Sequence, residues 1–574
     1  MDILYDFIFR VNKWLTPTKV FFILFCFGQI IYINSLGNPF MFDDITQIVS
    51  NSTVHSFSSI PAIFLNSSHT AITNGYYRPL LTSAFTILYS FFQANSFYFH
   101  YLQMLLHIVS TFIIYLIFKR YLNQGLSVLL SLIFLTHPIN EETVVYIANL
   151  QDVLFLFFGL IAFYLVQKNT KKISTIVLSI IFLFLSILSK ESGILFFIIC
   201  NMYLFLFKDS KRFTYLFFSF ITGGVYLLMR LIYQVPVKEP SVPILLLSLR
   251  ERLINIPEII FYYIRVLLFP KTLVAFNSWT IKNMNLNTFY MPLIIDFLFL
   301  AIVFCITFYI YKKSNEKKIA VLFLGWFILG LAIHLQIVPI DNTVADHFFY
   351  FPFIGLLALI GLFFKTIKVN KIFTTIGIIL CLLIILMFSY RTIIRNSNWS
   401  SSLNLSSHDE PLSQNNFTEE FNYGNALIQA GKNDEAMPYI QKAVELFPEN
   451  FRAWNNLGLL YYKKGDIEKA KNAWNKSIIL GKPFHEYPGT YENMAMLLLK
   501  YDNPTKAREF LRKATNMYPA NTVLWYDTIL ASYISHHSGE ALFAAKQYFL
   551  LKRDALSYYI YLSLLKNQPL QIKL

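Results

Sequence analysis

The sequence is poor in charged residues and in cysteine. Only 14% of its 574 residues are Asp, Glu, Lys or Arg, whereas 56% are hydrophobic and 58 are Phe. A soluble domain cannot bury that much apolar surface, so the composition indicates an integral membrane protein. The cysteines lie inside apolar runs without paired spacing, which argues against a disulfide framework and a zinc site. They are Cys26, Cys200, Cys305 and Cys381.

The sequence also lacks any excess of acidic residues, and its net charge is +15. In a soluble protein this charge would suggest binding to nucleic acid. Here the Lys and Arg residues form short clusters between apolar runs, where they act as topology signals, and no nucleic-acid partner is expected. No small-residue cleavage site follows the first apolar run, so we expect a retained first helix rather than a removed signal peptide.

Eleven apolar runs are candidates to cross about 30 Å of hydrocarbon, although several of them are short. They lie near 18–35, 101–118, 125–137, 151–167, 173–189, 192–207, 213–233, 291–311, 319–337, 349–364 and 372–390. Every second loop is basic, which predicts a cytoplasmic N-terminus. The predicted outer segments are 36–100, 138–150, 190–191, 234–290, 338–348 and everything after Tyr390. Within them, 250–271 is predicted to be a helix lying in the outer interface.

The sequence after about residue 400 is polar and contains three related units. Ala436, Ala470 and Ala507 mark equivalent positions, spaced 34 and then 37 residues apart. Small and aromatic residues recur in the same frame, which is the tetratricopeptide pattern of paired helices. We predict a degenerate capping repeat and a terminal helix after about residue 520.

These patterns predict an all-α protein built from a polytopic membrane helix bundle and an α-solenoid of tetratricopeptide repeats. The membrane domain is expected to span residues 1–395 and the repeats residues 417–574, with residues 396–416 as the linker.

The predicted outer loops gather ionisable side chains. Charged groups at membrane depth are costly unless they are paired or line a watery cavity, so we predict that these residues approach one chamber. Carboxylates can accept a proton from a hydroxyl nucleophile, and cations can hold a phosphate leaving group. This set suits the transfer of a sugar from a lipid phosphate to an alcohol. The candidates are Asp43, Asp44, Arg78, His137, Glu142, Lys190, Glu191, Arg230 and His347.

Each candidate also has a structural interpretation. Asp43 or Asp44 could cap a helix that begins at Ile45. His137 could end a helix before Pro138 and bind backbone groups. The remaining charged candidates could form local ion pairs or anchor helices at the interface.

The order of the motifs resembles the transmembrane O-mannosyltransferases with C-terminal tetratricopeptide repeats, and especially their bacterial relatives. The residues that carry this resemblance are the acid pair, "YYRPL", "HPINEETV", "SKESGI", "VADHFFYFP" and "RTIIRNSNW", followed by the repeats. The resemblance implies a glycosyltransferase of the GT-C class. Such an enzyme moves a sugar such as mannose, with inversion, from a polyprenyl-phosphate donor to a hydroxyl acceptor, here protein Ser or Thr, on the outer face.

The resemblance also implies roles for individual residues. It places the catalytic base at Asp43 or Asp44, where a divalent cation, Mg or Mn, is an open alternative. Glu142 matches an acid of the "HP" loop, and Lys190 and Glu191 match a "KE" pair. With His137, the residues Glu142 and Glu191 are assigned to substrate binding.

Two positions depart from the family pattern. Leu150 stands where many relatives have Arg shortly before the acid that matches Asp152, and His347 stands where they have Arg in the late loop. Both changes remove a fixed positive charge. Donor phosphate binding is therefore assigned to Arg78, Arg230 and Lys190, together with His347.

Two other functions fit parts of the sequence. An O-antigen ligase or oligosaccharyltransferase-like enzyme would place Arg and His chemistry in a large late loop such as 234–290. A membrane-anchored scaffold would need only one or two spans. We expect the repeats to recruit an acceptor protein or glycan, and we expect a bacterial cytoplasmic membrane with the repeats outside, or alternatively the endoplasmic reticulum membrane.

Overall fold

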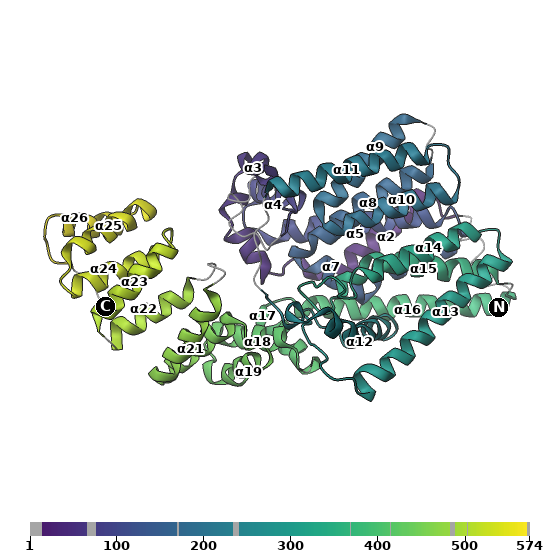
Figure 1. Ribbon diagram of the computed structural model, residues 1–574. Helices are drawn as coiled ribbons and strands as arrows, with labels where there is room; N and C mark the ends of the chain where they lie inside the picture. Colours follow the sequence, from purple (N-terminus) through teal and green to yellow (C-terminus); the bar gives the residue numbers. More distant parts are fainter. Residues whose placement is uncertain are drawn as a thin grey trace. The chain divides into compact units, whose positions relative to one another are not determined.

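The computed structural model describes residues 14–65, 76–168, 172–233, 240–367, 369–413, 415–482, 488–501 and 503–570. These residues are mostly helical, and the β-structure among them is one isolated bridge between Asn277 and Val344. They form two compact units. The first ends at Gln414, and the second comprises Asn415–Leu574 with Glu239–Pro243. The predicted all-α fold class is confirmed (Figure 1).

The first unit is a bundle of long apolar helices. They are α2 (Pro17–Tyr32), α3 (Ile60–Leu65), α4 (Pro79–Phe92), α5 (Ser96–Phe118), α6 (Gln124–Thr136), α7 (Glu141–Val145), α8 (Leu150–Lys168), α9 (Ile173–Ser189), α10 (Ile194–Leu206), α11 (Arg212–Tyr233), α12 (Leu249–Leu268), α13 (Met291–Lys313), α14 (Lys317–Ala332), α15 (Tyr350–Thr366), α16 (Lys371–Asn398) and α17 (Ser402–Asp409).

Each of the eleven predicted apolar runs coincides with one of these helices, and the protein is a multi-pass membrane protein. Among the described residues, seven helices are long and apolar enough to cross a membrane. An eighth is added if α6 and the bent segment Pro138–Val145 count as one span. The larger predicted number includes shorter helices, such as α10 with 13 residues and α14 with 16.

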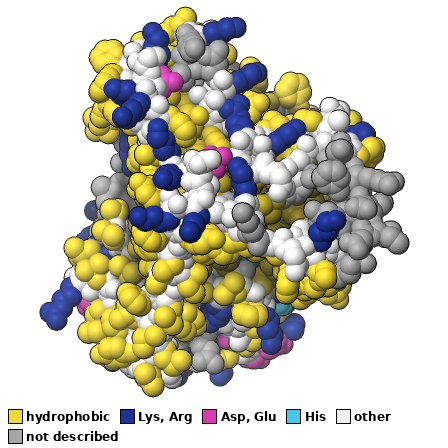
Figure 2. Space-filling view, turned by 90° about the vertical axis from the view of Figure 1, so that its right-hand side faces the viewer, with side chains coloured by type: hydrophobic (Ala, Val, Ile, Leu, Met, Phe, Trp, Pro, Cys, Tyr) yellow, Lys and Arg dark blue, Asp and Glu magenta, His cyan; other side chains and the backbone are white. Residues whose placement is uncertain are grey.

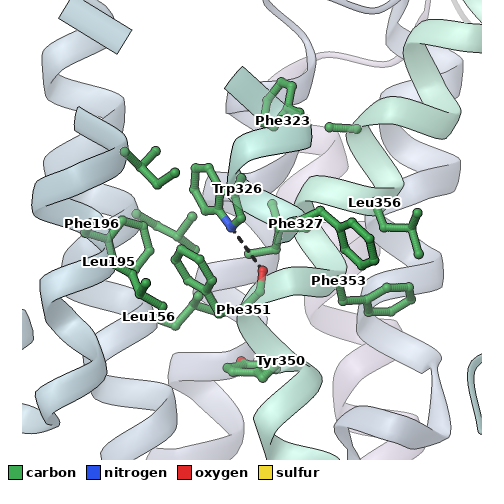
Figure 3. Close-up of a cluster of buried hydrophobic side chains, with 14 of the residues drawn as sticks. Leu156, Leu195, Phe196, Phe323, Trp326, Phe327, Tyr350, Phe351, Phe353 and Leu356 are labelled. Carbon is green, nitrogen blue, oxygen red and sulfur yellow. Dashed lines mark hydrogen bonds between the residues drawn. The ribbon is translucent and has the colours of Figure 1, made fainter. Parts of the chain in front are cut away.

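The core of this unit packs around Trp326 of α14 (Figure 3). The indole stacks on Phe351 of α15 with ring centroids 5.0 Å apart, and its Nε1–H donates to the Phe351 carbonyl at 3.0 Å. Phe196 of α10 packs edge-on against both rings. A Cβ atom on Gly159 of α8 would lie 1.9 Å from the Phe196 ring, so only glycine fits there. These contacts fix α8 against α10, α14 and α15.

The basic loops meet at one end of this bundle. Lys365, in the last turn of α15, donates to the Tyr121 carbonyl, after α5, and to the Glu316 carboxylate, before α14. Figure 2 shows many Lys and Arg side chains and few Asp or Glu on the side where Figure 1 marks the N-terminus. Helix α8 has 19 residues and is about 28 Å long. Its first turn, with Asp152, therefore lies at the end of the helix opposite its basic last turn.

The second unit is the predicted solenoid of paired helices. They are α18 (Phe417–Gln429), α19 (Asn433–Leu446), α20 (Phe451–Lys464), α21 (Ile467–Gly481), α22 (Gly489–Tyr501), α23 (Pro504–Met517), α24 (Thr522–Ile534), α25 (Ser538–Lys552) and α26 (Ala555–Leu565). The first six are the three predicted repeats, and α24, α25 and α26 follow them where the sequence predicted a further pair and one more helix. The predicted linker, 396–416, contains α17, which belongs to the first unit.

Gly458 tests the packing inside a repeat. A Cβ atom there would lie 2.5 Å from Nε1 of the buried Trp474, which donates to the Asn455 carbonyl at 3.0 Å. We expect Gly458→Leu to lower the free energy of unfolding by about 1–3 kcal/mol, because overpacking forces side chains and backbone to shift. Gly539→Ala is the matched control, since its Cβ would meet nothing within 4 Å. Thermal unfolding followed by circular dichroism measures both, and equal midpoints would contradict the packing.

Candidate active site

A break after α6 brings the candidate residues into the bundle. Pro138 has no N–H, so helix α6 cannot continue through it, and the next helical segment turns by 52°. The three carbonyl groups freed by this break each accept a hydrogen bond from a side chain, as a buried backbone in lipid requires. These pairs are Asn140 with the Phe134 carbonyl at 2.7 Å, Tyr32 with Leu135 at 3.2 Å and Thr392 with Thr136 at 2.9 Å.

His137 serves the same break. Its Nδ1 accepts from the Ile139 N–H at 3.1 Å, and its Nε2 lies 3.0 Å from the Leu267 carbonyl, to which it donates. Both ring nitrogens are therefore engaged with backbone. Among the described residues, His137 has no hydrogen bond or ion pair to another predicted site residue, so this arrangement matches the structural interpretation of the ring.

The segment Ile147–Asp152 connects the remaining candidates. It consists of a 3₁₀ turn, Ile147–Asn149, and the first residues of α8. In order along the segment, the Ala148 N–H binds Asp44 at 2.7 Å, Asn149 binds Glu142 at 3.1 Å, Gln151 binds Arg78, and Asp152 binds Lys190 at 2.7 and 2.8 Å. One short stretch of chain therefore joins residues from four other segments.

The two adjacent acids have different environments. Asp44 is 2% exposed, and its two oxygens accept from the N–H groups of Met41 at 3.1 Å and Ala148 at 2.7 Å. Burial raises the pKa of Asp44 well above its usual range, while these two donors act in the opposite direction. Asp43 is exposed, and its backbone N–H donates to the Tyr146 hydroxyl at 3.0 Å. The Asp44 side chain does not cap the following π-helical turn, Ile45–Val49, so the structure gives it an anchoring contact instead.

A strained residue separates the acids from the preceding chain. Phe42 has a φ of 48°, which is rare for any residue with a side chain and costs free energy. Its ring packs edge-on against Phe276 at 4.9 Å and Tyr146 at 6.5 Å, and Tyr146 stacks on Trp399 at 5.3 Å. The aromatic contacts hold the loop in the conformation that buries Asp44 and exposes Asp43.

The basic candidates gather around two carboxylates. Glu191 lies between Arg78 at 2.9 Å and Arg230 at 3.5 Å, and all three side chains are partly exposed. Arg78 also lies over the Tyr76 ring at 3.9 Å. The Lys190–Asp152 pair is buried, with exposed fractions of 8% and 3%.

His347 pairs with Glu142 at 2.8 Å, and its backbone N–H donates to the other Glu142 oxygen at 3.3 Å. Of the nine candidates, all except His137 are thus joined to the segment 147–152, or to Tyr146 before it, either directly or through at most three successive contacts. Their chemical roles stay predictions.

Sequence reasoning missed the neutral members of this site. Asn149 and Gln151 carry no charge and belong to no general motif. The sequence feature that could have identified them is their position just before Asp152 in "IANLQD". The sequence analysis also gave no role to a buried ion pair, in which Arg395 binds both oxygens of Asp409 at 2.5 and 2.8 Å. Arg395 Nε also lies 3.7 Å from Glu141, so this pair contacts the first turn of α7.

The described residues around the acid pair do not fit a divalent cation by themselves. Both oxygens of Asp44 already accept backbone hydrogen bonds. Within the described ranges, no group of three or more His, Cys, Asp or Glu side chains is placed to hold a metal ion. The protein side chains thus supply fewer ligands than Mg²⁺ or Mn²⁺ usually takes.

The chain was compared with protein-family models and with known proteins. The family model of the tetratricopeptide repeat matches residues 422–488. Human protein O-mannosyl-transferase TMTC3 is 23% identical over 89% of this chain and 65% of its own length. Human protein O-mannosyl-transferase TMTC1 is 26% identical over 76% of the chain and 55% of its own length. The Caenorhabditis elegans protein O-mannosyl-transferase F38B6.6 is 26% identical over 74% and 62%.

The chain is a homologue of the transmembrane O-mannosyltransferases with tetratricopeptide repeats. It spans less than two thirds of the length of these relatives. The resemblance carried by the sequence motifs is confirmed, and the family relationship covers both the membrane bundle and the repeats.

The buried ion pair of this homologue yields a test of the site's framework. We expect Lys190→Met to lower the free energy of unfolding by about 3–5 kcal/mol, because Asp152 would be left as a buried charge without its partner. The double variant Lys190→Met with Asp152→Leu should regain most of that loss. Thermal unfolding in detergent measures both. If the single variant is as stable as the double variant, the pair does not hold α8 to the segment before α10.

Proposed function

We propose that this protein is a membrane glycosyltransferase that moves mannose, with inversion, from a polyprenyl-phosphate donor to a Ser or Thr hydroxyl of an acceptor protein on the outer face. The observation that carries this proposal is the connection of an exposed Asp43 and a buried Asp44, through residues 146–152, to a group of cations. The relatives are named protein O-mannosyl-transferases, which supports both the sugar and the class of acceptor.

In the proposed reaction, Asp43 is the base. Its carboxylate takes the proton of the acceptor hydroxyl while that oxygen forms a bond to the anomeric carbon of the sugar. The bond between this carbon and the phosphate oxygen breaks, and the lipid phosphate leaves with the electron pair. A positioned carboxylate typically contributes about 10²–10⁴-fold in rate. Asp44 is a positioning residue, because its two backbone contacts fix the loop that presents Asp43.

The basic group is suited to the departing phosphate. Arg78, Arg230 and Lys190 carry three positive charges, and Glu191 and Asp152 carry two negative charges, which leaves one positive charge for an anion. Arg78 and Arg230 are partly exposed, whereas Lys190 is buried. We therefore assign direct phosphate contacts to the two arginines. Lys190 holds Asp152 in place and contributes to the positive electrostatic potential of the site.

The rival ligase function has less support. It would use Arg and His residues of the large late loop, of which the structure describes residues 240–290. There Arg252 donates to the backbone carbonyls of Leu247, Gln336 and Ile337 and thus has a structural role.

The proposed outer location follows from charge. The site lies at the first turn of α8, and the basic loops gather near the other end of that helix. By the positive-inside rule the basic end is cytoplasmic. The outer side is then the periplasm or exterior of a bacterium, or the lumen of the endoplasmic reticulum.

Two nearly isosteric variants test the chemistry. Asp43→Asn should lower kcat about 10²–10⁴-fold, because the amide replaces the carboxylate that acts as the base in the proposed reaction. Asp44→Asn should lower the free energy of unfolding by about 1–3 kcal/mol, because the amide cannot accept from both N–H groups. Glu468→Gln, on an exposed position of α21, is the control. Mass spectrometry of an acceptor peptide incubated with mannosyl polyprenyl phosphate measures transfer, and wild-type activity of Asp43→Asn would refute the assignment.

Cysteine labelling tests the topology. In a chain whose four cysteines are replaced, Glu449→Cys in the repeats should react with an impermeant maleimide added outside intact cells. Lys317→Cys, in a basic loop, should react only after the membrane is permeabilised. The opposite pattern would place the repeats and the site in the cytoplasm.

A further inference from the structure

Arg78 is held from three directions. Its Nε donates to a Glu191 oxygen at 2.9 Å, and its Nη1 donates to the Gln151 side-chain oxygen. The Tyr76 ring lies against the guanidinium face, with the central guanidinium carbon 3.9 Å from the ring centroid. A guanidinium has five N–H donors, and within the described ranges only these two are bound to other side chains. The three that remain, both on Nη2 and one on Nη1, are available to an anion.

The backbone of Arg78 is also restrained. Arg78 precedes Pro79, the first residue of α4, and steric clash disfavours the α-helical region for a residue before proline. Arg78 accordingly has a φ of −131° and a ψ of 62°. In the motif "YYRPL", one short stretch therefore supplies the cation, the ring that faces it and the proline that restricts its backbone.

The Tyr76 ring is anchored to a distant loop. Its hydroxyl donates to Asp341 Oδ1 at 2.5 Å, and Asp341 lies between α14 and α15, 265 residues further along the chain. A phenol that donates to a carboxylate becomes more polarised, so its π face attracts a cation more strongly. Asp341 thus fixes the ring in place and strengthens its attraction for the guanidinium.

We propose that Tyr76 and Asp341 are positioning residues that hold Arg78 in place for the lipid phosphate of the donor, an inference that rests on the proposed function. A long side chain that is mobile before binding loses rotamer freedom on binding, which weakens affinity by about 2–12-fold. Arg78 is already ordered by its three contacts. The ring covers one face, so phosphate oxygens are bound in the guanidinium plane, where two parallel N–H···O bonds can form. Tyr76 and Asp341 act through Arg78 and do not contact the phosphate.

Binding of farnesyl phosphate, a short polyprenyl phosphate, to the full chain in detergent tests this proposal by isothermal titration calorimetry. Tyr76→Leu removes the ring and should weaken binding about 2–12-fold. Tyr76→Phe keeps the ring and loses only the hydroxyl, so it should retain part of the affinity. Tyr311→Leu is the matched control and should bind as the wild type does, because this ring also faces a cation, Lys317 at 5.6 Å, but lies 45% exposed near the basic end of α13. Wild-type affinity of Tyr76→Leu would overturn the proposal.

Two variants separate the hydrogen bond of Asp341 from its charge. Asp341→Asn and Asp341→Ala both remove the negative charge, but the asparagine oxygen can still accept from the Tyr76 hydroxyl. We therefore expect farnesyl phosphate to bind more weakly to Asp341→Ala than to Asp341→Asn. Equal affinities would show that this hydrogen bond does not position Arg78, and would overturn the role of Asp341.

A comparison in the Arg78→Ala background tests whether the ring acts through the guanidinium. Tyr76→Leu should weaken binding in the wild type and change it no further in Arg78→Ala. An equal loss in both backgrounds would mean that Tyr76 only supports the fold, and would overturn the proposal. Transfer from mannosyl polyprenyl phosphate is measured on the same samples. Coupled losses of binding without transfer by the wild type would refute the transfer reaction alone, whereas transfer with equal losses would refute the positioning alone.

Discussion

The break at Pro138 is the constraint on which the site depends. A chain that leaves a helix inside a membrane exposes carbonyl groups that find no water, and each unpaired group would cost several kcal/mol. Here the three carbonyls are bound by Asn140, Tyr32 and Thr392. Two of these donors belong to α2 and α16, so the bend is stable only when those helices are packed against α6. The bundle and the bend form together, and the bend then directs residues 141–152 through the interior.

That path explains how residues so far apart in sequence come together. The interior stretch offers backbone N–H groups, two amide side chains and a carboxylate within a few residues of one another. Each of these binds a different incoming segment. The loop that carries Asp43 and Asp44 depends on this stretch most strongly, because aromatic packing against Tyr146 and Phe276 stabilises the unusual backbone conformation of Phe42.

The sequence predicted much of the fold, because long apolar runs and a 34-residue repeat have few alternative structures. It predicted less of the site. Charged candidates were visible because charge is rare in this chain, whereas Asn149 and Gln151 became recognisable only when their partners were in place. His137 was predicted to bind substrate, and its two ring nitrogens contact backbone groups of Ile139 in the bend and Leu267 in α12, which no local pattern indicates. Leu150, the departure from the family's Arg, is 0% exposed and packs with Ile147 and Leu154, so this position serves the core here.

The loss of the positive charge that many relatives carry at the position of Leu150 matters for the proposed chemistry. A sugar linked to a lipid phosphate is a phosphodiester with one negative charge, and the departing lipid phosphate gains a second as the bond breaks. Catalysis requires cations that attract the phosphate more strongly as its second charge develops. Cations that bound the intact donor equally tightly would not accelerate the reaction. Around Arg78 and Arg230, Glu191 already offsets part of the positive charge. In the proposed reaction, a donor with one negative charge would then be held weakly, and the guanidinium groups would attract the charge that develops in the transition state most strongly.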